Sequence, residues 1–454
     1  MHKKLHLIYA VLALAGPTML EQLMQTAVQY IDTAMVGSLG TAATAAVGAT
    51  TTVNWLVNGT VAALSIGFLS LIAKALGAGD QTVAKRVSAQ SISAVLISGI
   101  FFTVLTLSLS RYVPVWMQVD EPLRDSAARY FFILYAPMLP RAATIIFGTV
   151  LRAAGDTKTP MRIGIFVNAV NVFLNILLIY KTRSVNIFGS SITLYGAGLG
   201  VTGAALASAI AFTLGGVLIT VAFLRHPSVS PLGERILPDM TILRPALSIA
   251  FPNMLQRFAT SLGYVFFASM INSLGEVATA AHTIANTVES LFYIPAYGMQ
   301  TAAATLAGNA LGAGDKKQMR EYTKTIIVIE IFLNVLSGGL LFIFAPAMMA
   351  IFNKEIAVIA LGAIVLRMVA LSEPFYGICI ALEGMLQGVG NTRLPFVFNI
   401  IGMWGIRIAG TQVCVNILSG TLISAWGCMI LHNLILFTMF LVYCTKKKKN
   451  PLYG

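Results

Sequence analysis

The chain has 454 residues, of which 57% are hydrophobic and only 10% are charged. An ordinary soluble domain has about 25% charged residues, and a soluble core cannot bury so much apolar surface, which excludes a soluble globular protein and points to lipid as the solvent. The net charge of +13 lies in short connections and at the C-terminal end rather than on one face, which argues against a nucleic-acid partner.

Twelve apolar segments are long enough to cross a lipid bilayer as helices, which takes about 20 residues each. In chain order they are residues 12–36, 46–73, 88–110, 129–151, 161–181, 197–224, 243–271, 279–309, 325–352, 358–385, 396–417 and 420–444. The connections between them are short. We therefore predict an all-α polytopic membrane protein with twelve transmembrane helices and no sizeable soluble domain.

The basic residues indicate how the chain is oriented in the membrane. If the N-terminus is inside, most of the 30 lysines and arginines fall in cytoplasmic segments, and few fall in outer loops. The positive-inside rule then places both termini in the cytoplasm. We expect a multi-pass protein of the bacterial inner membrane, in which the run Lys446 to Lys449 contacts lipid headgroups.

Several motifs repeat at an offset of 235 residues, as between Asp80 and Asp315. The segment 75–80 (ALGAGD) returns identically at 310–315, 155–160 (GDTKTP) returns as GNTRLP at 390–395, and 16–20, 38–40 and 43–46 match 251–255, 273–275 and 278–281. The chain is thus predicted to be a duplicated six-helix unit with pseudo-twofold symmetry. Its predicted parts are an N-terminal lobe (1–225), a cytoplasmic linker (226–240) and a C-terminal lobe with a basic tail (241–454).

Folds of this kind generally bind substrate between the two halves near the middle of the membrane and expose it alternately to each side. The glycine, aspartate or asparagine, and threonine of the repeated loops favour tight turns that cap helix ends. We expect these loops to be structural.

Four groups of residues carry a resemblance to a known family: 29–37 (QYIDTAMVG), the paired ALGAGD loops, 151–157 (LRAAGDT) and 289–295 (ESLFYIP). Together they resemble the multidrug and toxic compound extrusion (MATE) family over nearly the whole chain. The resemblance implies a V-shaped, two-lobed transporter, with no cofactor and no enzymatic activity, that exports small organic substrates in exchange for protons or sodium. It also implies a cation-linked aspartate in the first helix, a position that matches Asp32.

Within this family the chain is most similar to the branch of the DNA-damage-inducible F transporters, which implies Gln25 and Asn175 as polar partners of Asp32. Those relatives typically carry a second acid four residues after the asparagine, where this chain has Ile179. Sodium-coupled members of another branch carry a glutamate near Thr260. Because both acids are missing, we favour protons as the coupling ion and keep sodium as the alternative.

Asp32 is also singled out by physical chemistry. An ionisable side chain within a span costs about 2.5–3.5 kcal/mol on insertion scales and is by default a functional hypothesis. Its repeat counterpart is Phe267, so an acid at this position is not required by the architecture that the halves share. Loss of hydration favours the neutral acid, which suits a group that binds and releases a proton. The alternative is a hydrogen-bonded structural aspartate.

Other acids within the spans have less distinct patterns. Glu21 has the polar counterpart Gln256, which favours a structural or cavity-lining role over coupling. Glu21 remains a secondary coupling candidate, as do Glu289 and Glu373 in the C-terminal lobe. The acids of this lobe, which include Glu383, could instead pair with arginines at 257, 367 or 407, and Glu383 and Arg141 are expected to hold helices of one lobe together.

Methionine and aromatic side chains repack around varied organic ligands and attract cations. The predicted substrate-binding residues are Met24, Tyr264, Phe267, Phe292, Tyr293 and Tyr376. For each of them, ordinary helix packing is the alternative.

Other functions fit the sequence less well. A lipid-linked oligosaccharide flippase of the same superfamily would need clustered arginines in its cavity, and here the arginines within spans are few and scattered. A membrane enzyme would need paired aspartates, a His-Glu-x-x-His helix or a Ser/His constellation, and none of these spacings occurs. No metal-ligand spacing is found either. We therefore predict a monomeric, proton-coupled exporter.

Overall fold

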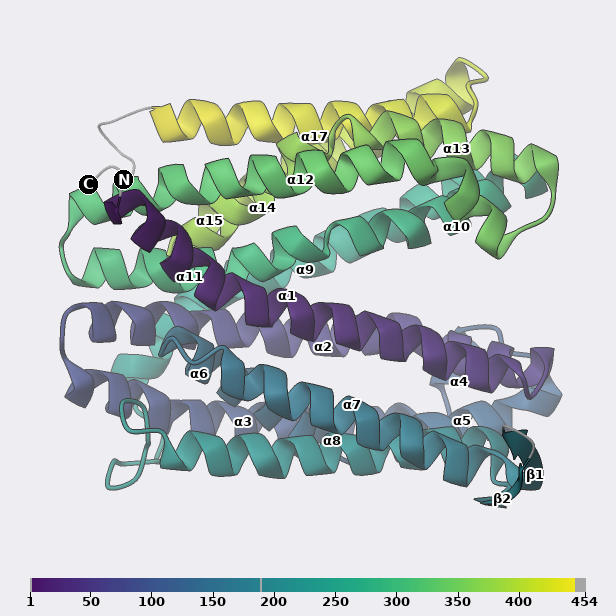
Figure 1. Cartoon of the computed structure of the whole chain (residues 1–454), viewed down its shortest axis with the longest axis horizontal. Helices are drawn as coiled ribbons and strands as arrows, with labels where there is room; N and C mark the ends of the chain where they lie inside the picture. The colour runs from purple at the N-terminus through teal and green to yellow at the C-terminus, as the bar shows by residue number, and fades with distance from the viewer. Residues whose placement is uncertain (1, 188–189, 446–454) are drawn as a thin grey trace.

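The structure is a computed structural model that describes residues 2–187 and 190–445. Long helices run side by side and form two halves, one above the other in Figure 1. The first half contains α1 (His2–Gly37), α2 (Thr41–Gly77), α3 (Gln81–Leu109), α4 (Val113–Trp116), α5 (Glu121–Tyr135), α6 (Met138–Ala153), α7 (Lys158–Ile179), β1 (Lys181–Ile187), β2 (Ser190–Ala197) and α8 (Gly200–Arg225).

The second half is also built from helices. It contains α9 (Met240–Asn272), α10 (Glu276–Phe292), α11 (Ile294–Gly312), α12 (Lys316–Phe352), α13 (Ile356–Ala370), α14 (Glu373–Gly388), α15 (Arg393–Ile400), η1 (Ile401–Ile408), α16 (Ala409–Gln412), η2 (Val413–Ile417) and α17 (Leu422–Thr445). The segments η1 and η2 are π-helical turns within one continuous helix from α15 to η2.

The predicted repeat is present in the element boundaries. At the offset of 235 residues, the ends of α1 and α9 correspond, α5 and α13 correspond at both ends, and α7 begins where α15 begins. The span α2 matches α10 and α11 together, which are separated only at Tyr293. The fold is therefore a duplicated six-helix unit, as predicted.

The number of membrane passes follows from the same correspondence. Among the described residues, eight helices are long and apolar enough to cross a membrane individually, and two bent pairs, α5 with α6 (48°) and α13 with α14 (55°), raise the number to ten. The helix α9 and the pair α10–α11 occupy the repeat positions of α1 and α2, which are both among the eight. Twelve helical passes in two bundles result, in agreement with the sequence prediction.

The outer surface of the bundle is apolar. On α12 the residues Val328, Phe332, Val335 and Ile343 are each more than half exposed, although water would disfavour such a stripe. Because these side chains point away from the bundle, they are placed to contact lipid.

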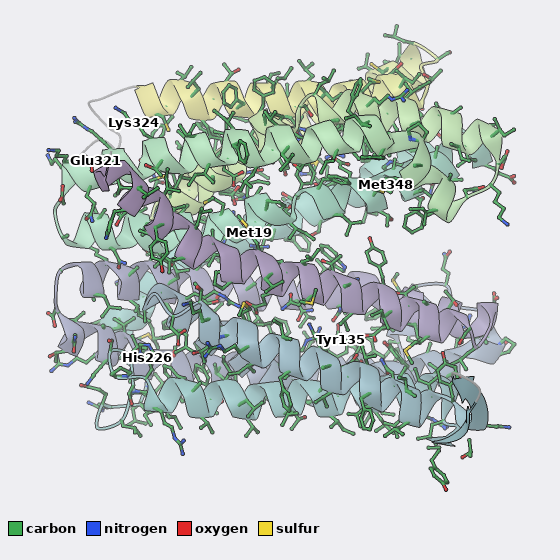
Figure 2. All side chains as sticks on the ribbon, viewed as in Figure 1. Met19, Tyr135, His226, Glu321, Lys324 and Met348 are labelled. Atoms are coloured by element: carbon green, nitrogen blue, oxygen red, sulfur yellow. The ribbon has the colours of Figure 1, made fainter. Side chains whose placement is uncertain are left out.

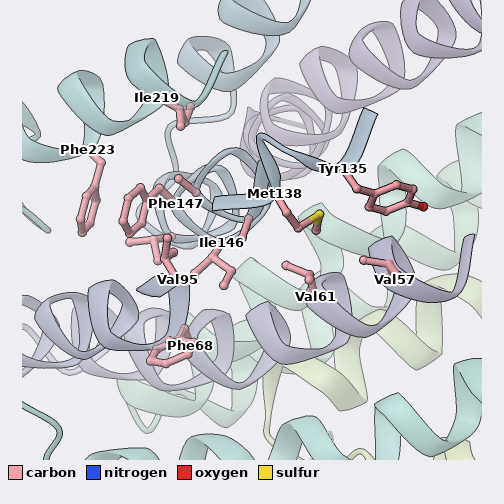
Figure 3. Packing of buried hydrophobic residues seen from close by; sticks show 14 of the residues in the cluster. Val57, Val61, Phe68, Val95, Tyr135, Met138, Ile146, Phe147, Ile219 and Phe223 are labelled. Carbon is pink, nitrogen blue, oxygen red and sulfur yellow. The ribbon is translucent and has the colours of Figure 1, made fainter. Parts of the chain in front are cut away.

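The core of the first half is formed by side chains from several helices. Phe147 of α6 stacks on Phe223 of α8 with 4.3 Å between ring centroids. Figure 3 shows this pair beside Ile146 and Ile219. In the same view Val61 and Phe68 of α2 pack against Met138 and Val95. This packing fixes the helices against which the polar residues of the site are placed.

The helix α1 contributes to the cores of both halves. Val11 and Ala15 near its beginning are fully buried in the same apolar cluster as Met299 of α11, whereas Val36 near its end belongs to the core of the first half. In Figure 1 the helix accordingly crosses from the upper half to the lower half. Thr18, one residue after Pro17, donates a hydrogen bond to the carbonyl oxygen of Gly298 (3.2 Å), which ties α1 to α11.

Two connections add detail that the sequence prediction lacked. The connection between α7 and α8 is an antiparallel β-hairpin of β1 and β2, which adds a short sheet to the otherwise helical fold. Its β-branched residues flank a Phe-Gly-Ser-Ser segment typical of a hairpin turn, a signal that the span prediction passed over. The linker between the halves is bound to α3, because Gln90 donates to the carbonyl oxygens of Arg235 (3.1 Å) and Leu237 (3.0 Å). The predicted Lys446 to Lys449 contact lies outside the described residues.

The repeated loops cap helices, as predicted. Asp80 accepts a hydrogen bond from the backbone N–H of Val83 (2.9 Å), and its counterpart Asp315 accepts one from Gln318 (2.8 Å). The glycine before each aspartate has a positive φ, 76° at Gly79 and 66° at Gly314. This backbone conformation explains why glycine recurs in both copies.

The two halves pack closely at the end of the molecule where α1 begins and α17 ends (Figure 1). Ser70 of α2 donates to the carbonyl oxygen of Gly388 (2.9 Å), and Thr305 of α11 donates to that of Arg152 (3.2 Å). A Cβ atom on Gly77 would overlap the carbonyl group of Asn309 in the other half. Small residues therefore allow backbone contact between the halves at this end.

Adding one methyl group at this contact should separate the halves. In Gly77→Ala the new Cβ meets backbone that cannot rotate away, so we expect a longer distance between spin labels on Gln81→Cys and Lys317→Cys in double electron–electron resonance. The control Gly339→Ala adds a methyl group where no other atom lies within 4 Å, and should leave the distance unchanged. Equal distances in both variants would contradict this account of the contact.

Candidate functional site

Asp32 and Asn175 meet between α1 and α7. Asn175 donates a hydrogen bond from Nδ2 to Oδ1 of Asp32 at 2.6 Å. The amide side chain is 1% exposed, whereas Asp32 is half-buried. A half-buried carboxyl group with a fixed donor on one side can still be reached by solvent on the other, as an exchangeable proton requires.

A second amide, Asn171, faces the same carboxyl group. When its side-chain amide is oriented to suit its neighbours, its nitrogen lies 3.0 Å from Oδ1 and 3.2 Å from Oδ2 of Asp32. Its oxygen then faces the Ser208 hydroxyl of α8 at 3.3 Å. The sequence prediction missed Asn171, although it precedes Asn175 by four residues and thus shares its helix face.

The remaining surroundings of Asp32 differ from what the resemblance implied. Gln25 is exposed on α1, two turns from Asp32, and no hydrogen bond joins the two side chains. Tyr130 of α5 lies within electrostatic reach of Asp32, and Arg141 of α6 is near Tyr130. Ile179 is 2% exposed and supplies no second acid.

Glu21 forms an ion pair with an unexpected partner. Nη2 of Arg152, at the end of α6, lies 2.7 Å from both carboxylate oxygens of Glu21 on α1. Both side chains are largely buried, with exposed fractions of 10% for Glu21 and 17% for Arg152. The ion pair is consistent with the structural interpretation of Glu21 given by its polar repeat counterpart.

The acids of the second half lie together within the bundle. Tyr293 donates to Oε1 of Glu289 at 2.8 Å, and its ring contacts that of Tyr376 edge-on, with 5.1 Å between centroids. Glu373, at the start of α14, is fully buried and interacts electrostatically with Glu289. The structure thus brings together both secondary candidates through Tyr293.

The arginines proposed as partners of these acids have other contacts. Arg407 lies over the rings of Phe267 (4.3 Å) and Tyr264 (4.9 Å), and Arg367 donates to the carbonyl oxygen of Phe342 (3.3 Å). Among the described residues no ion pair within 4 Å joins Arg257, Arg367 or Arg407 to an acid, although Arg257 attracts Glu383 and Arg407 attracts Glu289 electrostatically.

A further buried acid was not predicted. Glu330 of α12 is fully buried and hydrogen-bonded to Asn334, one turn later on the same helix. Asn334 packs directly against Gly377 of α14, where no larger residue would fit. An acid in the middle of a predicted span was visible in the sequence and was overlooked there.

The predicted substrate-binding residues occupy different environments. Tyr264 is 42% exposed, Met24, Phe292 and Tyr376 are half-buried, and Tyr293 and Phe267 are buried. Phe267 belongs to the core of the second half, where its ring contacts His282. In Figure 2 Met19, one turn before Met24, lies where α1 passes between the halves.

Twelve passes in two repeated bundles, with carboxyl groups held inside both, define an integral membrane transporter. The model of one protein family, MatE, matches residues 17–177 and 252–413, which is one match in each half. The chain belongs to the MatE family of membrane transporters and is not an enzyme. The more specific branch assignment remains a prediction.

Two curated relatives span most of the chain. It is 27% identical over 430 residues to the "Probable multidrug resistance protein NorM" of Thermotoga maritima, covering 95% of this chain and 90% of that protein. It is 24% identical to the human "Multidrug and toxin extrusion protein 1", covering 96% of this chain and 73% of the relative.

Solved structures share the fold. The chain superposes on a MATE transporter in complex with MaD3S with a TM-score of 0.88, at 22% identity and with 96% and 95% of the two chains covered. A multidrug resistance MATE transporter in an outward-facing conformation gives a TM-score of 0.87 with the same identity and coverage. A transporter of the MOP superfamily from Pyrococcus furiosus gives 0.85 at 23% identity.

The ion pair between Glu21 and Arg152 should stabilise the fold only as a pair. Removing one partner leaves a buried charge, so Glu21→Gln or Arg152→Gln should each lower the free energy of unfolding by about 3 kcal/mol. The double variant resembles the second half, which has Gln256 and Gln387 at the corresponding positions, and should recover most of the loss. A double-mutant cycle of chemical unfolding in detergent measures this, and additive losses would contradict the pairing.

Proposed function

We propose that this protein exports small organic compounds, cationic or amphipathic, in exchange for protons, and that Asp32 is the carboxyl group that binds the proton. The observation that carries the proposal is the hydrogen bond of 2.6 Å from Asn175 to Asp32, formed between α1 and α7 inside the first half. The proposal of efflux is supported by two similar proteins, which are named for multidrug resistance and for multidrug and toxin extrusion.

The protonation state of Asp32 changes which hydrogen bonds it can form. As a carboxylate it only accepts, and the amides of Asn175 and Asn171 are suitable donors. As a neutral acid it also carries an O–H donor, for which these two amide nitrogens offer no acceptor. Proton binding therefore weakens the attachment of α1 to α7 at this point.

The same helix can transmit that change to the other half. The beginning of α1 is bound to α11 through Thr18 and through the buried Val11 and Ala15. A change at Asp32 therefore alters the position of a helix that both halves share. A proton moving inward across the membrane supplies about 2.3 kcal/mol per 100 mV for this cycle.

Glu21, Glu289 and Glu373 are less suited to carry the coupling alone. Glu21 has a fixed counter-charge in Arg152. Glu289 and Glu373 are buried, with exposed fractions of 5% and 0%, and remain candidates for a second coupling group. Sodium coupling is the second candidate mechanism, because rotation of the Asn171 and Asn175 amides would place two amide oxygens beside the carboxylate, and oxygen ligands suit a hard cation.

Transport in proteoliposomes tests the proposal. With the full chain reconstituted, an imposed pH gradient should drive ethidium against its concentration gradient, and Asp32→Asn should abolish this movement because its side chain cannot bind a proton. The matched control is Asp125→Asn, which changes an exposed aspartate of α5 and should transport like the wild type.

Two results would contradict the assignment. A sodium gradient that drives ethidium regardless of pH would replace protons by sodium. Unchanged pH-driven transport in Asp32→Asn would move the coupling group to the second half, where Glu289→Gln and Glu373→Gln are the next variants.

A further inference from the structure

Each half contains one carboxyl group at the same place in the repeated fold, where its first, fourth and fifth spans meet. In the first half the four positions are Glu21, Gly148, Arg152 and Gly164, and 235 residues later they are Gln256, Glu383, Gln387 and Asn399. In the second half the acid therefore lies on the fourth span instead of the first, and a glutamine replaces the arginine.

In the first half the charge is balanced by the chain itself. Arg152 lies 2.7 Å from both oxygens of Glu21. Both glycines adjoin the ion pair: a Cβ atom on Gly164 would make an ordinary contact of 3.5 Å with Cγ of Glu21, and one on Gly148 would lie 3.3 Å from Nη1 of Arg152.

In the second half the carboxylate of Glu383 receives hydrogen bonds but forms no ion pair in the described part of the chain. Glu383 accepts from Gln256 and Gln387 at 3.0 Å each and from Asn399 at 3.3 Å. Within the described residues, no lysine or arginine nitrogen lies within 4 Å of its carboxylate. Three amides satisfy the lone pairs of a carboxylate but cannot neutralise it, so a charge in this environment still requires a cation.

The surroundings of Glu383 suit an organic cation. The phenol groups of Tyr297 and Tyr376 interact electrostatically with it, and Tyr264 interacts electrostatically with both. One face of Tyr264 is covered by Arg407, 4.9 Å from the ring centroid, whereas Tyr297 is 44% exposed. Aromatic rings attract ammonium and phosphonium groups, so Tyr297 and Tyr376 are the rings that can assist the carboxylate.

Two other groups lie near the carboxylate. Arg257, which follows Gln256 on α9, is exposed and attracts Glu383 electrostatically without forming an ion pair. Cys379, one turn before Glu383 on α14, is buried. Arg257 therefore reduces the local negative potential without occupying the site.

We propose that Glu383, positioned by Gln256, Gln387 and Asn399, binds the positive charge of a cationic organic substrate in place of the arginine that neutralises its counterpart in the first half. Glu383 is then the residue that selects substrates by charge. This inference rests on the proposed export of organic compounds, and it goes beyond the purely structural role that the sequence suggested for Glu383.

Binding of tetraphenylphosphonium to the purified full chain tests the inference, measured by isothermal titration calorimetry. We expect Glu383→Gln to bind at least tenfold more weakly. We expect the same of Gln387→Arg, because it reproduces the first-half arrangement and supplies an internal cation. The matched control Gln81→Arg adds the same charge at an exposed residue and should bind like the wild type.

The second variant keeps the test decisive if Glu383→Gln does not fold, as judged by thermal unfolding. Wild-type affinity in either folded variant would overturn the inference. A Glu383→Gln protein with unchanged affinity but no response to a pH gradient would make Glu383 a proton site and would also overturn it.

The same measurements separate this inference from the proposed function. A wild-type protein that moves ethidium in response to a pH gradient but binds no tetraphenylphosphonium would overturn the inference alone. A wild-type protein that binds tetraphenylphosphonium through Glu383 but ignores the pH gradient would overturn proton coupling alone.

Discussion

A carboxyl group inside a membrane protein must be neutralised by a partner, by a proton or by a ligand, and this constraint explains most of the polar structure of the bundle. Glu21 is neutralised by Arg152, a residue of the same half. Asp32 and Glu383 have amide donors and no ion-pair partner within the described residues. Each carboxylate therefore accepts hydrogen bonds, but its negative charge is not neutralised by the described part of the protein. This is the state expected of a group that binds a cation reversibly.

The helix α1 carries both Glu21, whose charge is balanced by Arg152, and Asp32, which has no ion-pair partner within the described residues. Glu21 and Asp32 are eleven residues apart, which is about 16 Å along the helix, and they are attached to α6 and α7 respectively. Near Glu21 the helix is also attached to the second half through Thr18. The middle of α1 is thus held by an ion pair, and the part near its C-terminal end by the hydrogen bonds of Asp32. Under the proposed proton coupling, protonation of Asp32 would move that part relative to the middle.

Much of this architecture could be predicted from the sequence because it depends on local patterns. Apolar length predicts the spans, and the constant offset predicts the duplicated unit and the capping role of Asp80 and Asp315. The contact of Asp32 with Asn175 was implied by the family resemblance. Long-range partners were harder, because whether Arg152 faces Glu21 or the cytoplasm depends on how α6 is rotated within the bundle. Hydropathy alone does not determine that rotation.

The comparison of the two halves contains a signal that single positions do not. The Glu21 position becomes Gln256 while the Arg152 position becomes Gln387, so both members of an ion pair are lost together, and a new acid appears at Glu383 where the first half has a glycine. Duplication first supplies two equivalent sites, and divergence then leaves one with an internal cation and one without. The backbone contacts between the halves are kept in both copies, whereas the ion pair is found in one copy, so the proposed proton site and the proposed substrate site fall in different halves.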